Sequence, residues 1–123
     1  MTVIRQDDFI DSVADALQFI SYYHPVDFVQ AVHQAYEREL NPAAKDAMAQ
    51  ILINSRMCAE GHRPICQDTG IVTVFLKIGM DVQWDATLSV ADMVIDGVRR
   101  DYTHPDNVLR ASILEDPAGA RRN

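Results

Sequence analysis

Residues 63–79 read RPICQDTGIVTVFLKIG, a short polar turn that leads directly into the most apolar stretch of the chain. The run from Ile71 to Ile78 is nearly continuous in β-branched and apolar residues. Such a run suits a strand buried on both faces better than an edge strand, which alternates apolar and polar residues. We therefore predict a buried strand at about 71–78, ended by Gly79 and belonging to a small sheet.

Two amphipathic helices are predicted near the start of the chain. The first begins at Asp7 or Asp8, either of which can cap it, and carries apolar residues at helical spacing. It ends just before Pro25, because proline disfavours helical geometry at the residue that precedes it. The second helix begins around Pro25 to Asp27 and stops at the pair Asn41-Pro42.

A third helix is predicted from Asn41 to Gly61. Asn41 is its cap and Pro42 its first residue, where a missing backbone N–H costs little. Gly61 is expected to end the helix in the left-handed conformation. Cys58 falls on the apolar side of this helix, which favours a structural role, since thiols are among the most buried side chains.

Two further elements complete the predicted fold. A short segment around Trp84 is expected to pair as a second strand, and a helix is expected at about 89–102, where THPDN breaks it. Gly70 is expected to supply a positive φ or a close backbone approach. The predicted class is therefore α+β and helix-rich, with three N-terminal helices before the sheet.

Composition bounds the function. The 123 residues are 48% hydrophobic and 24% charged, as expected for one soluble domain spanning 1–123. The net charge of -7 disfavours nucleic acids and anionic membranes, which bind clustered Lys and Arg. The chain has no apolar signal core at its start and no run of the roughly 18 apolar residues that span a membrane, so we expect a reducing, cytoplasmic location.

The last eight residues, DPAGARRN, contain no apolar anchor and no helix cap. They resemble a linker more than the end of a domain. We expect 117–123 to be a truncated linker and the chain to be an N-terminal fragment of a longer protein.

The turn at Cys66 carries a thiol, an amide and a carboxylate in succession, and each allows two interpretations. Cys66 is either a half-buried thiol that behaves as a small hydrophobic residue or part of a site on a loop that a rigid scaffold holds. Asp68 is either a turn residue that accepts nearby N–H groups or a functional carboxylate. Arg110 lies among apolar residues in DNVLRASI, where a guanidinium needs an internal or a bound anion.

The segment ILINSRMCAEGHRPICQDTGIVTVFLKIG, residues 51–79, resembles the N-terminal region of the class I, iron-sulfur-dependent fumarate hydratases and the related L(+)-tartrate dehydratases. The hallmark of these enzymes is a Cys-Gln-Asp-Thr-Gly turn before a strand, which matches residues 66–70 here. The later segment DNVLRAS, residues 106–112, supports the same resemblance.

The resemblance implies roles for four residues. Cys66 would be one of three thiolates that hold a [4Fe-4S] cluster, whose remaining iron acts as a Lewis acid on the substrate. Gln67 and Asp68 would lie against a small dicarboxylate, fumarate or malate, with Asp68 as the candidate catalytic residue. Arg110 would pair with a substrate carboxylate bidentately, through two parallel hydrogen bonds.

The resemblance also implies partners that the chain lacks. Cys66 and Cys58 are its only cysteines, so the other cluster ligands must come from the remainder of the polypeptide. We expect the isolated chain to be inactive and without its cluster, and the full-length hydro-lyase to hydrate fumarate reversibly as a homodimer. Two alternatives remain open: an L(+)-tartrate dehydratase fragment, and a non-enzymatic helical interaction or redox-sensing module in which Cys66 is structural or a sensor.

Overall fold

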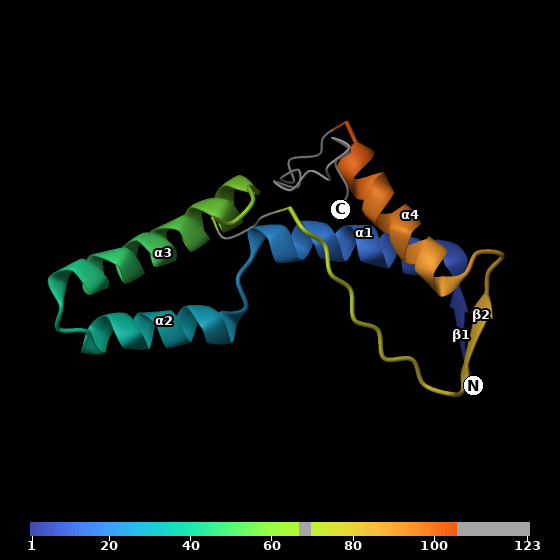
Figure 1. Cartoon of the computed structure of the whole chain (residues 1–123), viewed down its shortest axis with the longest axis horizontal. Helices are drawn as coiled ribbons and strands as arrows, with labels where there is room; N and C mark the ends of the chain where they lie inside the picture. The colour runs from blue at the N-terminus through green and yellow to red at the C-terminus, as the bar shows by residue number, and fades with distance from the viewer. Residues whose placement is uncertain (67–69, 106–123) are drawn as a thin grey trace, which may run out of the picture. The chain divides into compact units, whose positions relative to one another are not determined.

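A computed structural model describes residues 1–66 and 70–105 of the chain. The described part is rich in helix and contains one small sheet, which confirms the predicted α+β class (Figure 1). The elements, in order, are β1 (Thr2–Arg5), α1 (Gln6–Tyr22), α2 (Val26–Arg38), α3 (Pro42–Gly61), β2 (Val82–Asp85) and α4 (Val90–Thr103). The four helices lie close to where the sequence predicts them, but the predicted cap of α1 is wrong, because the helix begins at Gln6 and Asp7 and Asp8 lie in its first turn.

The described residues fall into two compact units. One contains Met1–Gln18 together with 70–105, and the other contains residues 19–66. Helix α1 contributes to both, because its last turn belongs to the second unit. None of the helices in the described part is long and apolar enough to cross a membrane.

The sheet of the first unit pairs β1 with β2. The two strands are parallel, with Thr2 opposite Val82 and Arg5 opposite Asp85. The predicted strand around Trp84 is thus confirmed, but its partner is an N-terminal strand that the sequence analysis missed. Trp84 also packs against Phe9 of α1, with an edge-to-face arrangement and ring centroids 5.1 Å apart.

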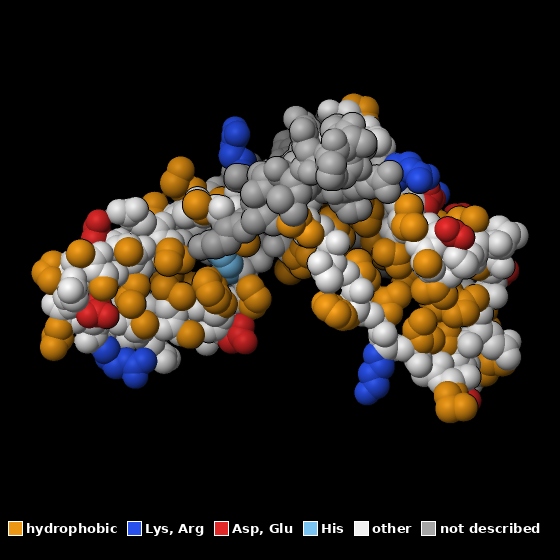
Figure 2. Space-filling model, viewed as in Figure 1, with side chains coloured by type: hydrophobic (Ala, Val, Ile, Leu, Met, Phe, Trp, Pro, Cys, Tyr) orange, Lys and Arg blue, Asp and Glu red, His pale blue; other side chains and the backbone are white. Residues whose placement is uncertain are grey.

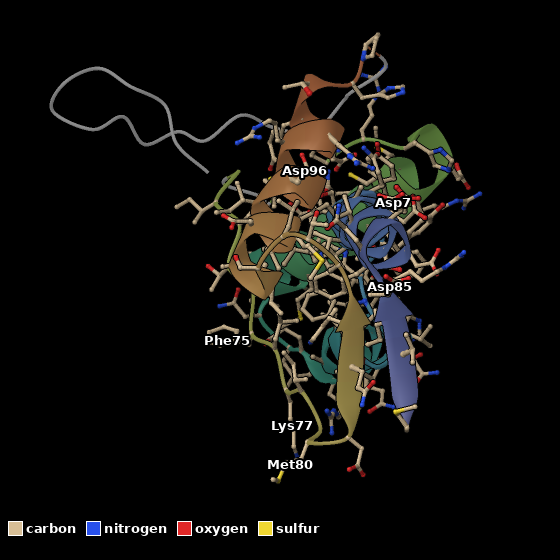
Figure 3. The ribbon with its side chains drawn as sticks, turned by 90° about the vertical axis from the view of Figure 1, so that its right-hand side faces the viewer. Asp7, Phe75, Lys77, Met80, Asp85 and Asp96 are labelled. Carbon is tan, nitrogen blue, oxygen red and sulfur yellow. The ribbon has the colours of Figure 1, made fainter. Side chains whose placement is uncertain are left out.

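The predicted strand at 71–78 is wrong. These residues form no strand, and the side chains of Phe75 and Met80 project from the segment (Figure 3). Phe75 is 91% exposed. A strand exists only through hydrogen bonds to a neighbouring strand, and within the described residues β1 and β2 pair only with each other. High β-propensity without a partner therefore leaves this run without strand structure.

The core of the first unit lies where α4 crosses α1. Ile10 and Met93 are fully buried, and Gly97 follows Met93 one turn later on the same face of α4. A Cβ at Gly97 would lie only 2.8 Å from the Cβ of Val13 and 2.9 Å from the backbone oxygen of Ile10. Only glycine lets the two helices approach this closely.

In the second unit, α2 and α3 lie side by side as a helical hairpin (Figure 1). No residue of α2 is fully buried, and hydrophobic side chains gather on the visible face of this pair (Figure 2). Ile53 and Met57 of α3 are exposed, as is Leu40 in the connection between the two helices. The apolar surface of these helices is therefore only partly covered by the described residues.

The ends of α3 partly follow the prediction. Asn41 is the cap, and its Oδ1 accepts the backbone N–H groups of Ala43 at 2.9 Å and Ala44 at 3.2 Å. Gly61, however, is the last helical residue, and the left-handed residue is His62, with φ 49°. The predicted terminator is thus wrong by one position. Contacts of the His62 ring, described below, offset the cost of a positive φ outside glycine.

Candidate functional site

The structure positions one of the four predicted site residues. Cys66 is the last residue described before the gap at 67–69, so Gln67 and Asp68 lie outside the described residues. Arg110 also lies outside them, within 106–123. Gly70, the last residue of the motif, has φ 76°, as predicted. The site can therefore be built upward from Cys66 and from the residues that hold it.

The segment 62–66, which we call the anchored turn, is held at every residue. Cys58 in the last turn of α3 provides most of the partners: its backbone oxygen accepts the N–H groups of His62 and Arg63, and its thiol donates to the oxygen of Pro64 at 3.4 Å. The N–H of Ile65 donates to the backbone oxygen of Ser21 at 2.9 Å. The backbone leading to Cys66 is thus fixed on two sides.

The N–H of Cys66 itself donates to Oδ1 of Asn54 at 3.0 Å. Asn54 lies on α3 one turn before Cys58, and the same Oδ1 is 3.7 Å from the Cys58 sulfur. The two thiols have opposite environments, because Cys58 is 3% exposed whereas the Cys66 side chain faces solvent. Cys58 is structural, as predicted, and the thiol of Cys66 is the accessible one.

An aromatic cluster holds the start of the anchored turn. The His62 ring stacks on Tyr22 with an interplanar angle of 2° and centroids 5.4 Å apart. Its Nε2 lies 3.1 Å from the hydroxyl of Tyr23, within hydrogen-bonding distance. The neighbouring His24 similarly pairs its Nδ1 with the Ser55 hydroxyl at 3.0 Å. The end of α1 and the end of α3 are thereby joined beside the turn.

Of the described residues, Cys66 alone suits the role of a ligand for the iron-sulfur cluster that the sequence implies. Thiolates are the usual donors for iron-sulfur clusters, and a thiol at the end of a fixed turn can reach a metal. Cys58 cannot serve as a second donor in this arrangement, since its buried sulfur is directed at Pro64 and Asn54. Within the described residues, no three His, Cys, Asp or Glu side chains are grouped to hold a metal ion.

Charged groups in the first unit form a separate arrangement. A polar pocket lined by Arg5, Asp7, Asp8 and Asp85 contains the ion pair of Arg5 and Asp8, with a nitrogen to oxygen distance of 2.8 Å. The hydrogen bond from Arg5 lowers the pKa of the Asp8 carboxyl. The pair is exposed, and its two charges neutralise each other. We therefore assign it a local structural role at the start of α1 and no catalytic role.

Asp101 on α4 is the one carboxyl with a raised pKa among the described residues. It is 6% exposed, and its removal from water raises its pKa, against the lowering effect of a hydrogen bond from Gln18. The nearby Asp15 raises it further, whereas His104 lowers it. The second oxygen of Asp101 has no hydrogen-bond partner within the described part of the chain. The proton is therefore held more tightly in the folded state than in the unfolded state.

Asn54 and Ser21 are the residues that the sequence analysis missed. The spacing of Asn54 and Cys58, four residues apart on one helix, was the available signal for a side chain that reaches the same turn. Ser21 acts through its backbone oxygen, which any residue would supply. Nothing in its side chain could have revealed that contact.

Comparison with known proteins agrees with the motif at Cys66. Residues 10–123 match the family described as fumarate hydratase (Fumerase). The chain is also 30% identical, over 90 residues, to a protein of Methanocaldococcus jannaschii named "Putative L(+)-tartrate dehydratase subunit alpha".

That match covers 73% of this chain and 32% of the archaeal protein, so the matched part spans about a third of the length of that relative. No solved structure is significantly similar to the chain. The family match includes nearly every residue from α1 onward and contains the whole anchored turn. The chain therefore belongs to the fumarate hydratase (Fumerase) family.

Proposed function

We propose that this chain is part of an iron-sulfur hydro-lyase that, in its complete form, adds water reversibly to fumarate to give malate. The observation that carries the proposal is the exposed thiol of Cys66 at the end of an anchored turn, inside a sequence that belongs to the fumarate hydratase family. A thiol that served only for packing would be buried, as Cys58 is.

In this proposal Cys66 provides one thiolate ligand of a [4Fe-4S] cluster. When bound, the cluster supplies an iron without a protein ligand, which acts as a Lewis acid toward the hydroxyl and a carboxylate of the substrate. The contribution of the anchored turn is to hold the backbone of Cys66, so that little conformational freedom remains to be lost when the thiolate binds.

The residues that follow Cys66 in the motif contact the substrate in this proposal. Gln67 and Asp68 lie against the dicarboxylate, and Asp68 is the candidate catalytic residue. Arg110 binds one substrate carboxylate, because its planar guanidinium matches a carboxylate with two parallel hydrogen bonds. A cation suits this position, because the substrate carboxylate is an anion.

The complete enzyme needs more than these 123 residues. The chain has two cysteines, and one is buried in α3, whereas a cluster held by protein thiolates needs three or four. We propose that residues 1–123 form an N-terminal domain, that further polypeptide supplies the other ligands, and that the complete enzyme is a homodimer.

A second substrate is favoured by one specific observation. The archaeal relative is named a tartrate dehydratase subunit, and it shares 30% identity with this chain. Loss of water from L(+)-tartrate gives oxaloacetate by the same type of elimination, with one additional hydroxyl on the substrate. Tartrate is therefore the alternative substrate for the same site.

Steady-state kinetics of the anaerobically reconstituted complete enzyme test the proposal. We expect turnover of fumarate and malate, with kcat/KM for malate above that for L(+)-tartrate. A higher value for tartrate would select the alternative substrate. Turnover of neither, in an enzyme that carries its full complement of iron and sulfide, would contradict the assignment as a hydro-lyase.

A further inference from the structure

We infer that Asn54 is a positioning residue for Cys66. Its side-chain oxygen accepts the backbone N–H of Cys66 and so determines where the exposed thiol leaves the turn. The inference rests on the proposed role of Cys66 as a cluster ligand, since positioning matters only if the thiol binds something. The contact itself belongs to one compact unit, and all its residues are described.

The contact with Asn54 differs in kind from the others in the anchored turn. The N–H groups of residues 62, 63 and 65 donate to backbone oxygens, which would be present whatever the side chains were. The N–H of Cys66 instead depends on a side chain twelve residues earlier. It is also the last described hydrogen bond before the polar residues of the motif. A change at position 54 can therefore release Cys66 while the rest of the turn stays held.

The chemistry of the amide suits this role. A carbonyl oxygen has two lone pairs, so Oδ1 of Asn54 can accept the N–H of Cys66 at 3.0 Å and lie 3.7 Å from the Cys58 thiol. Asn54 is partly buried on a long helix, whose regular hydrogen bonds hold its backbone. The oxygen thus links the accessible thiol to a rigid element.

The direct test is amide hydrogen exchange measured by NMR on this chain, with no metal present. Asn54→Leu keeps the side-chain size but removes the acceptor, and we expect exchange of the Cys66 amide to become at least tenfold faster. Exchange of the Ile65 and Arg63 amides should change less than twofold. Asn54→Asp retains an acceptor oxygen and should restore slow exchange at Cys66.

Gln50→Leu is the matched control. Gln50 lies one turn earlier on α3 and donates to Asp46 at 2.9 Å, so its replacement also removes one side-chain hydrogen bond from the same helix. It should leave all three amides unchanged. Unaltered exchange of Cys66 in Asn54→Leu would overturn the inference. So would equal acceleration at Ile65 and Arg63, because that pattern would reflect general loosening of the unit.

A second measurement separates this inference from the proposed function. In the iron-loaded complete enzyme, we expect Asn54→Leu to lose iron to a chelator at least threefold faster, and Gln50→Leu to match the unsubstituted enzyme. Faster amide exchange with unchanged iron loss would make Asn54 a structural anchor only, and would overturn its positioning role. Full iron content in Cys66→Ser would instead contradict the proposed function, whatever Asn54 does to the amide.

Discussion

The anchored turn and the apolar run that follows it in the sequence differ in how far their structure is held by other residues. The anchored turn, residues 62–66, satisfies its backbone through partners that lie within the same unit, on α3 and at the end of α1. The apolar run at 71–79, only a few residues later, forms no strand and exposes large side chains. A helix end can be completed by its own helix and by nearby side chains, but a strand needs a second strand. The comparison shows that strong local propensity is insufficient when the pairing partner is absent from the described residues.

The largest expected effect comes from substituting the two cysteines of this region separately. Cys66→Ser in the complete enzyme should abolish retention of the cluster and turnover, because the proposed function makes Cys66 a thiolate ligand. Cys58→Ala should keep both and lower the free energy of unfolding by a few kcal/mol at most, about the cost of a small cavity. Iron content, activity and one denaturant titration for each variant measure these effects. If Cys58→Ala lost the iron and Cys66→Ser did not, the roles assigned to the two cysteines would be reversed.

A matched pair of substitutions compares the packed contact between α1 and α4 with the exposed run at 71–79 in the same unit. Gly97→Ala should lower the free energy of unfolding by about 1–3 kcal/mol, because the added Cβ meets Val13 at 2.8 Å between two packed helices. Phe75→Ser should change it by less than about 0.5 kcal/mol in this chain, since the side chain is 91% exposed.

Urea titrations of this chain followed by circular dichroism measure both members of the pair. A large loss of stability in Phe75→Ser would mean that the run at 71–79 packs against something in solution. A negligible effect of Gly97→Ala would mean that α1 and α4 are not in close contact. Either result would remove one side of the contrast between a packed core and an unpaired run.

The smallest expected effect is the pH dependence that Asp101 contributes to the first unit. Burial raises its folded-state pKa above the ordinary value of 3.8, so the folded state holds the proton more tightly than the unfolded state. Its stabilising contribution is therefore complete below the unfolded pKa and is lost as the pH rises through the folded pKa. The loss amounts to about 1.4 kcal/mol for each unit by which the pKa is raised.

Asp101→Asn should remove this pH dependence, since the amide resembles the protonated carboxyl and does not ionise. We expect the melting temperature of the variant to exceed that of the unsubstituted chain at pH 7, and the difference to shrink as the pH falls toward 4. Thermal melts of the variant and the unsubstituted chain across this pH range measure the difference. A variant that is less stable than the original at pH 7 would show that the carboxylate makes a favourable interaction when ionised.

Several elements of the fold could be predicted because their determinants are close in sequence. Asn41 and Pro42 begin α3 as expected, since capping and the missing N–H of proline act within one turn. α4 begins close to the predicted residue 89, where the Ser89 hydroxyl caps it by accepting the backbone N–H of Asp92 at 3.1 Å. The terminator of α3 was misplaced by one residue because the left-handed His62 depends on Tyr22 and Tyr23, which are about forty residues away.

The sequence by itself determined the helices, the Asn41 cap of α3, the family motif at Cys66 and the burial of Cys58, because each depends on short-range spacing and on the chemistry of single residues. Only the tertiary structure decided which strand pairs with β2, that 71–78 pairs with no strand of the described residues, and that Asn54 holds Cys66. It also decided that Asp101 is buried with one oxygen unpartnered among the described residues. These outcomes depend on which distant groups meet in space, and the free energy of such contacts cannot be assigned until the partner is known.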